Sequence, residues 1–596
     1  MQYKVITAEI HTRTALHVGS GAGNETTDAL IRRDAAGNPI IPGTALAGVL
    51  RSLLTRLTPR IDGSVCNALK NQDETCHCAV CRLMGALNPS DEGDNARASR
   101  LLVFNATLRK AGNEKNEDNK KDEAQNQNSA SHIRDGVGID RATGAAARVG
   151  RVKFDLETLS AGAIFDFRLE LREVPKQNKE LETILAAGLA EWQAGRAWVG
   201  GRVNRGMGAF KLESPVFKTL DLDDPKNLVA FLGDDKPWET LAKTAKGETW
   251  PTDQAKAIAI HPLLGNRDLA PHVAQTWVKI TGTLRAAGPL LTNDTVSSTL
   301  TGFDHAPLLA QWGRWQHPVL GGAGLRGVIR SHAERIARTI ATHHAESKDD
   351  FLRICPACNP VESRKEAALA NCDSLLKENG VSNNAEVNDQ QLCLACLLFG
   401  SSRRGSRLVV EDAPYNAKVA GEKPKLKMFD FLAVDRFTGG GAEGFKFDAL
   451  ALWQPAFTLN LYLENPAPWE LGWLVLVLRD MQAGWLNVGM GAAKGFGRME
   501  LQDDLLLTLG YLHADDLAAF ELDADGQRDG LYTEKTFSLS EAAGWVTQFN
   551  EKIKGNAKKG IAEFSRGDEE HQLPKLPADT YFNGTVDKLY PREVTL

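Results

Sequence analysis

The chain has 596 residues, of which 42% are hydrophobic and 24% charged, close to an average soluble globular protein. This composition excludes collagen, a coiled coil and wholesale disorder, and the length predicts about two to four domains. The formal net charge is −6, from 70 Lys and Arg against 76 Asp and Glu. Taken over the whole chain, this charge argues mildly against a nucleic-acid partner.

The first ten residues alternate polar and apolar side chains like a strand and lack the hydrophobic region of a secretion signal. The longest strongly apolar run, residues 473–478, is far shorter than the roughly 20 residues that span a bilayer. We therefore expect a cytoplasmic protein without membrane contact. In a reducing compartment, clustered cysteines favour metal binding over disulfides.

The nine cysteines form two clusters, four in residues 66–81 and five in residues 355–396. The second cluster contains two Cys-x2-Cys pairs, whose four thiolates are typical of tetrahedral zinc, and leaves Cys372 as a spare thiol. The first cluster has less standard spacing, and His77 could replace one cysteine. A redox Cys-x2-Cys pair is the alternative. The predicted zinc ligands are Cys66, Cys76, Cys78, Cys81, Cys355, Cys358, Cys393 and Cys396.

Five segments of the chain recur in the same order, which indicates a tandem duplication. The matches are GVLRS (48–52) with GVIRS (327–331), CAVCRLMG (78–85) with CLACLLFG (393–400), SRLLV (99–103) with SRLVV (406–410), IDRATG (139–144) with VDRFTG (434–439), and RGMG (205–208) with KGFG (494–497). The predicted organisation is a module 1–214, a mixed segment 215–275, a second module 276–501 and an acidic extension 502–596.

Each module is predicted to begin with a strand, at 3–14 and 277–285, followed by a helix, the cysteine cluster and further strands. The helix of the first module follows Thr44, a candidate N-cap. Its later elements are a strand 163–171, a helix 181–194 and a strand 209–212. This strand-helix-strand-strand-helix-strand order fits an α+β fold of the ferredoxin-like or RRM-like type. Residues 112–131 are strongly polar and predict a disordered loop.

Both modules contain a late glycine-rich loop, at 200–208 and 489–498, with cations at the matched positions Arg205 and Lys494. Glycine lets backbone N–H groups approach phosphates, although such loops often only connect a helix to a strand. Neither loop has the Walker pattern, so nucleotide hydrolysis is not supported. In the first module Asp34 starts a turn, whereas Asp28 lies in a polar loop without an obvious structural role.

These residues resemble the RAMP-superfamily backbone subunit of type III CRISPR effector complexes. The resemblance rests on HVGSG (17–21), Asp28, IPGTALAGVLR (41–51), Ile139-Asp140-Arg141 and the glycine-rich loop. It covers both modules, and a chain with two modules is similar to the fused double backbone subunit of subtype III-D. The second module departs from the pattern, because LGG (320–322) replaces IPG and its loop is about three residues longer.

The resemblance implies two ferredoxin-like palms, each with a zinc-binding insertion and a β-hairpin thumb, near 135–154 and 429–447. It implies binding of CRISPR RNA and single-stranded target RNA, cleavage of the target at regular intervals with Mg²⁺ or Mn²⁺, and assembly with a large polymerase-like subunit and further backbone and small subunits. The implied catalytic residues are Asp28 and Asp304. The expected RNA contacts are His17, Arg51, Arg141, Arg202, Arg205, Arg330, Arg436 and Lys494.

Two alternatives stay open on the sequence: a non-catalytic scaffold that only holds RNA, and a zinc-stabilised module that processes the guide precursor. The second would require a convincing His or Tyr general base near the glycine-rich loop, which the sequence does not offer. The charge is compatible with RNA binding by the modules, because the extension 502–596 carries −8 and the segment 215–275 carries −2, which leaves +4 for the two modules.

Overall fold

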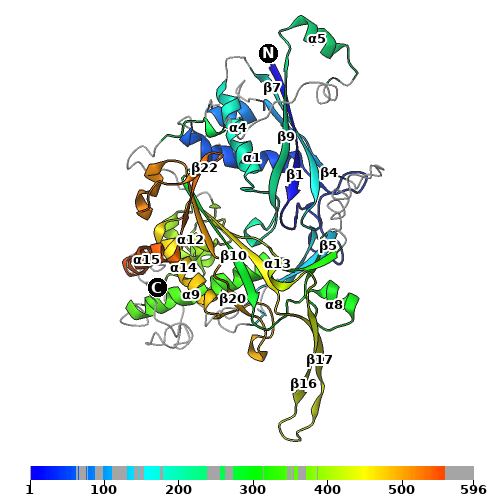
Figure 1. Cartoon of the computed structure of the whole chain (residues 1–596), viewed down its shortest axis with the longest axis vertical. Coiled ribbons are helices and arrows are strands. Elements are labelled where there is room, and N and C mark those ends of the chain that lie inside the picture. Colours follow the sequence, from blue (N-terminus) through cyan, green and yellow to red (C-terminus); the bar gives the residue numbers. More distant parts are fainter. Residues whose placement is uncertain are drawn as a thin grey trace.

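The chain folds around two antiparallel sheets, one in each half of the sequence (Figure 1). Cys66, His77, Arg141 and the predicted loop up to residue 130 lie outside the described residues. The computed structural model describes residues 2–61, 65, 76, 78–86, 98–109, 131–139, 145–146, 153–174, 179–235, 237, 255–261, 273–312, 315–344, 351, 355–359, 371–384 and 387–556.

The first sheet has the strand order β2-β4-β7-β1-β9-β8, with β3 also paired to β7. If β3 and β4 are counted as one interrupted strand, the four central strands of the sheet have the order 4-1-3-2 of a ferredoxin-like fold. This is the fold that the element order predicted. The strands are β1 (Gln2–Thr12), β2 (Ile40–Ile41), β3 (Leu101–Val103), β4 (Ala106–Leu108), β7 (Ile164–Val174), β8 (Ala197–Trp198) and β9 (Ala209–Asp221).

Helices α1 and α4 pack together against this sheet and bury its apolar side chains. The Trp192 ring lies edge-on between Phe167 and Phe210, at centroid distances of 5.8 and 5.2 Å. Helix α1 begins at Gly43 with Pro42 as the N-cap, so the expected cap at Thr44 is wrong by two residues. The helices of this half are α1 (Gly43–Leu57), η1 (Thr58–Arg60), α2 (Ala79–Met84), α4 (Lys179–Gln193), η3 (Val203–Arg205) and α5 (Pro225–Leu232).

The second sheet has the order β14-β18-β10-β21-β23-β22, and β20 pairs with both β10 and β19. Its core repeats the arrangement of the first sheet, while β21, β22 and β23 come from the segment after residue 501 and extend it. The strands are β10 (Thr276–Ala286), β14 (Leu408–Val410), β18 (Ala456–Glu464), β19 (Leu486–Asn487), β20 (Arg498–Leu501), β21 (Leu506–Tyr511), β22 (Gln527–Asp529) and β23 (Tyr532–Phe537).

Helices α9, α14 and α15 pack together in the second half, where the rings of Trp473 and Phe549 stack at 5.0 Å. The part of the acidic extension up to residue 556 therefore contributes to this core. The helices are α8 (Thr295–Thr301), α9 (Gly322–His344), α11 (Cys372–Glu378), η5 (Asp389–Gln391), α12 (Leu394–Phe399), α13 (Ala417–Ala420), α14 (Pro468–Gln482), η6 (Ala492–Lys494), η7 (Ala514–Phe520), η8 (Leu539–Ala542) and α15 (Ala543–Asn556).

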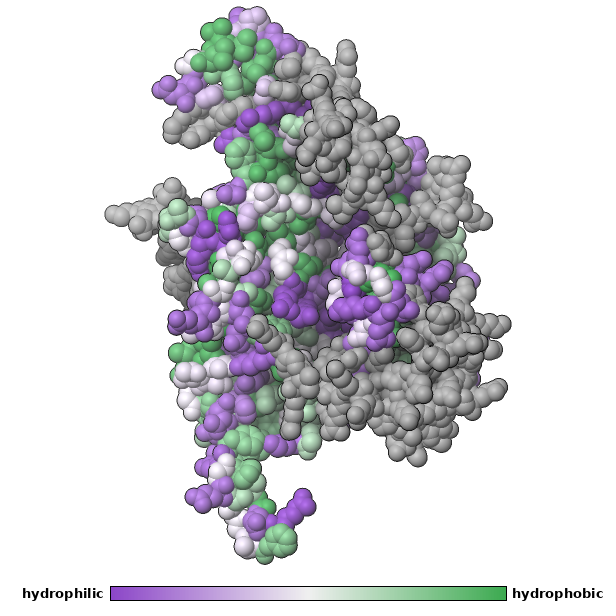
Figure 2. Space-filling view, turned by 180° about the vertical axis from the view of Figure 1, so that it is seen from behind, coloured by the Kyte–Doolittle hydropathy of each residue, from purple (hydrophilic) through white to green (hydrophobic). Residues whose placement is uncertain are grey.

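A β-hairpin branches from each half at the region expected for a thumb. The hairpin of the second half extends far from the body, at the opposite end of the molecule from α5 (Figure 1), and its surface mixes apolar and polar side chains (Figure 2). Phe437 at its tip is 99% exposed. The strands are β5 (Ser131–Val137) and β6 (Lys153–Leu159), and β16 (Leu426–Val434) and β17 (Gly441–Trp453) with β11 (Pro289–Leu290).

The two halves are in direct contact. Arg134 of β5 forms a buried ion pair with Asp412 at 2.6 Å, and Arg13 pairs with Glu411 at 2.9 Å. A small sheet close to this junction contains β12 (Leu309–Trp312), β13 (Trp315–Leu320) and β15 (Ala413–Pro414). Among the described residues, no helix is both long and apolar enough to cross a membrane.

Candidate active sites and metal centres

Asp28 is an exposed side chain in the loop between β1 and β2, and the hairpin fixes its position. The loop runs beside β6, where the N–H of Glu157 donates to the carbonyl of Ala29 at 2.9 Å. Two residues earlier on β6, the N–H of Asp155 donates to the Asp28 carboxylate at 2.9 Å. Because alternate N–H groups of a strand point to the same edge, this carboxylate takes the place of a backbone carbonyl in the ladder.

Asp304 has the same relation to the second hairpin. The N–H of Leu450 donates to the carbonyl of His305 at 2.9 Å, and the N–H of Asp448 donates to the Asp304 carboxylate at 3.0 Å. In addition, the N–H of Asp304 donates to the Asp448 carboxylate at 2.8 Å. The structure therefore brings Asp304 to a position equivalent to that of Asp28, although its loop is longer and contains α8.

Each hairpin places two further aspartates beside the loop aspartate. Asp135 lies opposite Asp155 in the first hairpin, and Asp430 lies opposite Asp448 in the second. Burial, together with the neighbouring Asp135 carboxyl, raises the pKa of Asp155. Both halves thus gather three carboxyl groups at the base of one hairpin.

These hairpin aspartates are not among the residues predicted from the sequence, although a signal for them exists. The tripeptide Lys-Phe-Asp at 153–155 recurs at 446–448, in order with the five other matches. This tripeptide is short enough to recur by chance. Its importance is visible only in the structure, where the loop aspartate lies next to it.

Cations of the two glycine-rich loops lie over aromatic rings of the two hairpins. The Arg202 guanidinium is 4.2 Å from the centroid of the Phe154 ring, and the Lys494 ammonium is 4.3 Å from that of Phe447. These rings immediately precede Asp155 and Asp448. The loops predicted to bind phosphate are therefore in contact with the hairpins that hold the loop aspartates.

The cations of the first loop have no carboxylate partner among the residues that the structure describes. Burial lowers the pKa of Arg202, and burial followed by repulsion from Arg202 and Arg330 lowers the pKa of Arg205. Half-buried guanidinium groups without a counter-ion are unfavourable, and a bound anion would offset that cost. The arrangement fits binding of a phosphate group.

Glycines of these loops allow close approach of the protein's own backbone. A Cβ atom at Gly200 would lie 2.3 Å from the carbonyl oxygen of His17, and one at Gly208 would lie 2.1 Å from that of Val199. Both glycines have positive φ, at 92° and 79°. These glycines therefore allow the loop to pack against the core. This role differs from the one inferred from the sequence, in which they let backbone N–H groups approach phosphates.

Arg51 and Arg330, expected as RNA contacts, instead hold the cysteine helices. Arg51 donates to the carbonyl of Gly85 at 2.9 Å, and Arg330 donates to the carbonyl of Gly400 at 3.0 Å. These two glycines end α2 and α12, so each cation lies at the negative end of a helix dipole. Arg330 is also buried and paired with Glu334 at 2.7 Å. The geometry supports a structural role for both arginines.

The remaining predicted RNA contacts have different environments. His17 is buried, and its Nδ1 lies 2.7 Å from the backbone carbonyl oxygen of Glu157. Arg436 is exposed in the turn between β16 and β17. The preceding Asp435 accepts the N–H groups of Phe437 and Thr438, and these bonds lower its pKa and close the turn. Arg436 is therefore placed where it could reach a ligand, whereas His17 is enclosed.

A hollow of about 360 Å³ lies beside Asp304. In the first half, the described part of the corresponding loop contains no helix like α8. The hollow is lined by Asn293, Thr295, Ser298, Thr299, Gly302, Phe303 and Asp304.

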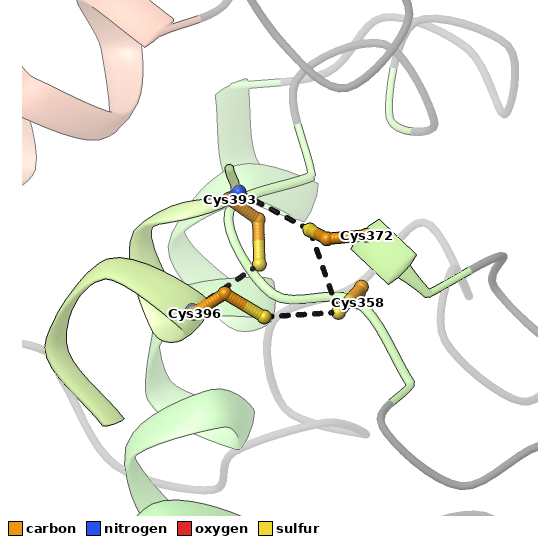
Figure 3. A group of neighbouring side chains, drawn as sticks. All are labelled: Cys358, Cys372, Cys393 and Cys396. Atoms are coloured by element: carbon orange, nitrogen blue, oxygen red, sulfur yellow. Dashed lines mark hydrogen bonds between the residues drawn. The ribbon is translucent and has the colours of Figure 1, made fainter. Parts of the chain in front are cut away.

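Four buried cysteines of the second cluster converge on one point (Figure 3). The sulfurs of Cys358 and Cys396 are 3.5 Å apart, and those of Cys358 and Cys372 are 3.8 Å apart. Cys355 is outside this group, and its thiol donates to the carbonyl of Ala357 at 3.3 Å. The geometry corrects the sequence prediction: Cys372 joins the group as the fourth sulfur, and Cys355 is the spare thiol.

The four sulfurs fit a tetrahedral zinc ion. Zn–S bonds of about 2.3 Å place the sulfurs of a tetrahedron about 3.8 Å apart, close to the spacing seen here. The backbone N–H groups of Cys393 and Cys396 also donate to sulfurs of the group, at 3.3 and 3.4 Å. Such donors stabilise thiolates and orient them towards a metal.

Three cysteines of the first cluster, Cys76, Cys78 and Cys81, also bring their sulfurs within 4.8 Å of one another. The fourth expected ligand, Cys66, and its possible substitute His77 lie outside the described residues. Arg51 lies 3.6 Å from the Cys81 sulfur, and Arg330 lies 3.9 Å from the Cys396 sulfur. Both clusters could therefore bind zinc in a similar setting.

Comparison with known proteins places both halves of the chain in one family. The sequence profile of the RAMP superfamily matches residues 9–211 and 307–500, together more than half of the chain. The protein named CRISPR system Cms endoribonuclease Csm3 from Methanocaldococcus jannaschii is 27% identical over 207 residues, which cover 34% of this chain and 75% of that protein. The protein of the same name from Enterococcus italicus is 28% identical over 233 residues, which cover 37% of this chain and 96% of that protein.

Each relative thus matches a stretch about as long as one of the two profile regions. The first region includes Asp28 and both strands of its hairpin, and the second includes the hairpin strands β16 and β17 but begins after β10 and Asp304. The chain therefore belongs to the RAMP superfamily and carries two ferredoxin-like RAMP regions in tandem.

Proposed function

We propose that this chain is a backbone subunit of a type III CRISPR ribonucleoprotein, similar to the fused double subunit of subtype III-D. It binds CRISPR RNA and complementary target RNA and cleaves the target at regular intervals. The observation that carries this proposal is an arrangement found in both halves: a loop aspartate accepts a hairpin N–H, and a cation of the glycine-rich loop lies over the phenylalanine ring that precedes this N–H. The two relatives named as endoribonucleases support it.

In this proposal Asp28 and Asp304 act on the target RNA, one in each half. Arg202, Arg205 and Lys494 contact RNA phosphates and fix the strand beside the carboxylate. The hairpins hold the strand so that a 2′-hydroxyl lines up with the adjacent phosphate, and this alignment supplies much of the rate. A bound Mg²⁺ or Mn²⁺ would neutralise charge on the departing oxygen, with the loop aspartates among its ligands.

The two cysteine clusters serve as structural zinc clips in this proposal. Closed sets of four protein ligands are typical of structural rather than catalytic zinc. The partners would be CRISPR RNA, target RNA and other subunits of the complex, including a large polymerase-like subunit. The proposed domain limits remain those inferred from the repeats, with modules 1–214 and 276–501.

The proposal is tested with the purified complex, its guide RNA and a labelled complementary target. In the Asp28→Asn/Asp304→Asn double variant, cleavage should slow at least about 100-fold, because both carboxylates are lost, while target affinity stays within about twofold. Glu25→Gln, an exposed carboxylate in the Asp28 loop, is the matched control and should cleave normally. Undiminished cleavage by the double variant would reject the catalytic assignment, and a complex whose wild type binds but never cleaves would be a scaffold.

A further inference from the structure

The proposed catalytic aspartates are exposed loop residues, so something must hold them in place. In both halves the hydrogen-bond donor is the N–H group that follows a hairpin phenylalanine, Phe154 or Phe447. In both halves a cation of the glycine-rich loop lies over that ring. Loop aspartate, hairpin and glycine-rich loop are therefore linked through one aromatic side chain.

We propose that Phe154 and Phe447 are positioning residues for Asp28 and Asp304. Each ring, clamped by Arg202 or Lys494, fixes the base of its hairpin, so that the next N–H group holds the loop carboxylate in place. The inference rests on the proposed function, because it takes the two aspartates as the catalytic groups. Neither ring touches the reacting atoms in this account.

The geometry of the strand supports this role. Successive side chains of a strand point to opposite faces, while N–H groups lie in the plane between them. The Phe447 ring therefore meets the glycine-rich loop on one face of β17, and the Asp448 N–H points to the edge where Asp304 lies. A rotation of β17 about its own axis would move both contacts together. The cation on the ring opposes such a rotation.

The two halves build the same clamp from different residues. In the first half the Phe154 ring covers Gly136 of the opposite strand, where a Cβ atom would lie 2.1 Å from the ring. In the second half Phe447 stacks on Phe431 at 4.7 Å. The cation also differs, since Arg202 lies three residues before the position that matches Lys494. The shared feature is the order of cation, ring and carboxylate.

The test compares the two sets of cuts within one complex, so that each set is the internal control of the other. Phe447→Leu should slow the cuts made at Asp304 about tenfold at saturating target, leave the cuts at Asp28 unchanged and leave target affinity within twofold. It should also raise the Mg²⁺ concentration for half-maximal cleavage at the affected cuts, because the carboxylate is less well placed.

Phe445→Leu is the matched control, since this ring lies on the same face of β17, is 66% exposed and makes no described cation contact. It should leave both sets of cuts unchanged. The inference is overturned if Phe447→Leu leaves the rate unchanged, slows both sets equally, or acts only through target affinity. Asp304→Asn separates the two claims: if it leaves all cuts intact the proposed function fails, and if it removes one set while Phe447→Leu does nothing, only the positioning role fails.

Discussion

At the scale of single residues, the imidazole of His132 shows how the first hairpin is tied to the module junction. Arg134 donates to its Nε2 at 3.0 Å, and the Thr158 hydroxyl lies 3.1 Å from the same nitrogen. This nitrogen is therefore an acceptor and carries no proton. Burial, and then the charge of Arg134, lowers the pKa of His132 to about 3. Arg134 is thereby left free to pair with Asp412 across the junction.

This arrangement predicts a pH dependence of stability. The folded pKa of about 3 lies below the unfolded value of about 6.5, so the unfolded chain binds the extra proton between these values. The stability contributed by neutral His132 is fully present well above pH 6.5 and is lost as the pH falls through 6.5 towards 3, by about 1.4 kcal/mol at pH 5.5. His132→Gln keeps a hydrogen-bond acceptor but has no group that titrates in this range. We expect its melting temperature to fall less than that of the wild type when the pH is lowered from 7.5 to 5.5. Equal losses would show that His132 is not buried as a neutral group.

At the scale of elements, sequence spacing predicted the cysteine clusters but not which four cysteines of the second cluster converge. The Cys-x2-Cys rule favoured Cys355, because no local pattern marks Cys372 as a ligand. The chain returns Cys372 to the group at the first residue of α11, and this depends on the tertiary path of the insertion. Long-range geometry of this kind cannot be derived from spacing alone.

Serine substitutions distinguish the two cysteines. Cys372→Ser removes one of the four converging sulfurs, so we expect the second cluster to lose its zinc and the protein to be destabilised by several kcal/mol. Cys355→Ser removes only a thiol that donates to a carbonyl, and zinc content should stay as in wild type. Metal analysis of both purified variants checks this. Loss of zinc in Cys355→Ser with retention in Cys372→Ser would restore the ligand set inferred from the sequence.

Other elements followed from the sequence more directly. Strand β10 and helix α4 were predicted within about two residues, because their apolar periodicity is determined by burial against one core. The loop aspartates were found through the family resemblance, and Asp155 and Asp448 were missed, because hairpin pairing places them beside the loop. Arg330 was assigned to RNA since its burial against Glu334 and Gly400 is not visible in a sequence.

At the scale of the whole molecule, the two RAMP regions are joined in a specific order. Arg13 and Arg134 of the first half meet Glu411 and Asp412 of the second. By the SRLLV and SRLVV match, the first half carries Phe104 and Asn105 where the second carries these acids. In these two ion pairs the first half therefore supplies the arginines and the second half supplies the carboxylates. The two halves could not exchange these roles. The backbones also meet at this junction, where the N–H of Asp412 donates to the carbonyl of Gly206 at 3.1 Å.

Two glycines near the start of α9 test how tightly this helix packs against β14 and Gly206. A Cβ atom at Gly322 would lie 2.3 Å from the carbonyl oxygen of Val410 and 2.8 Å from the Cα of Gly206, whereas one at Gly324 has nothing within 4 Å. We expect Gly322→Ala to lower the free energy of unfolding by about 1–3 kcal/mol through overpacking. Gly324→Ala should be neutral or stabilise by up to about 1 kcal/mol. Urea denaturation of both variants measures this, and equal stability of the two would contradict tight packing at the start of α9.

The central claim is that both halves carry an independent RNA-cleaving aspartate. The most direct test maps the cut positions on one end-labelled target RNA with complexes that contain Asp28→Asn or Asp304→Asn. We predict that each variant removes its own subset of the evenly spaced cuts and leaves the other subset at its normal rate. If either variant removes all cuts, or if neither removes any, the two halves do not act as separate catalytic sites.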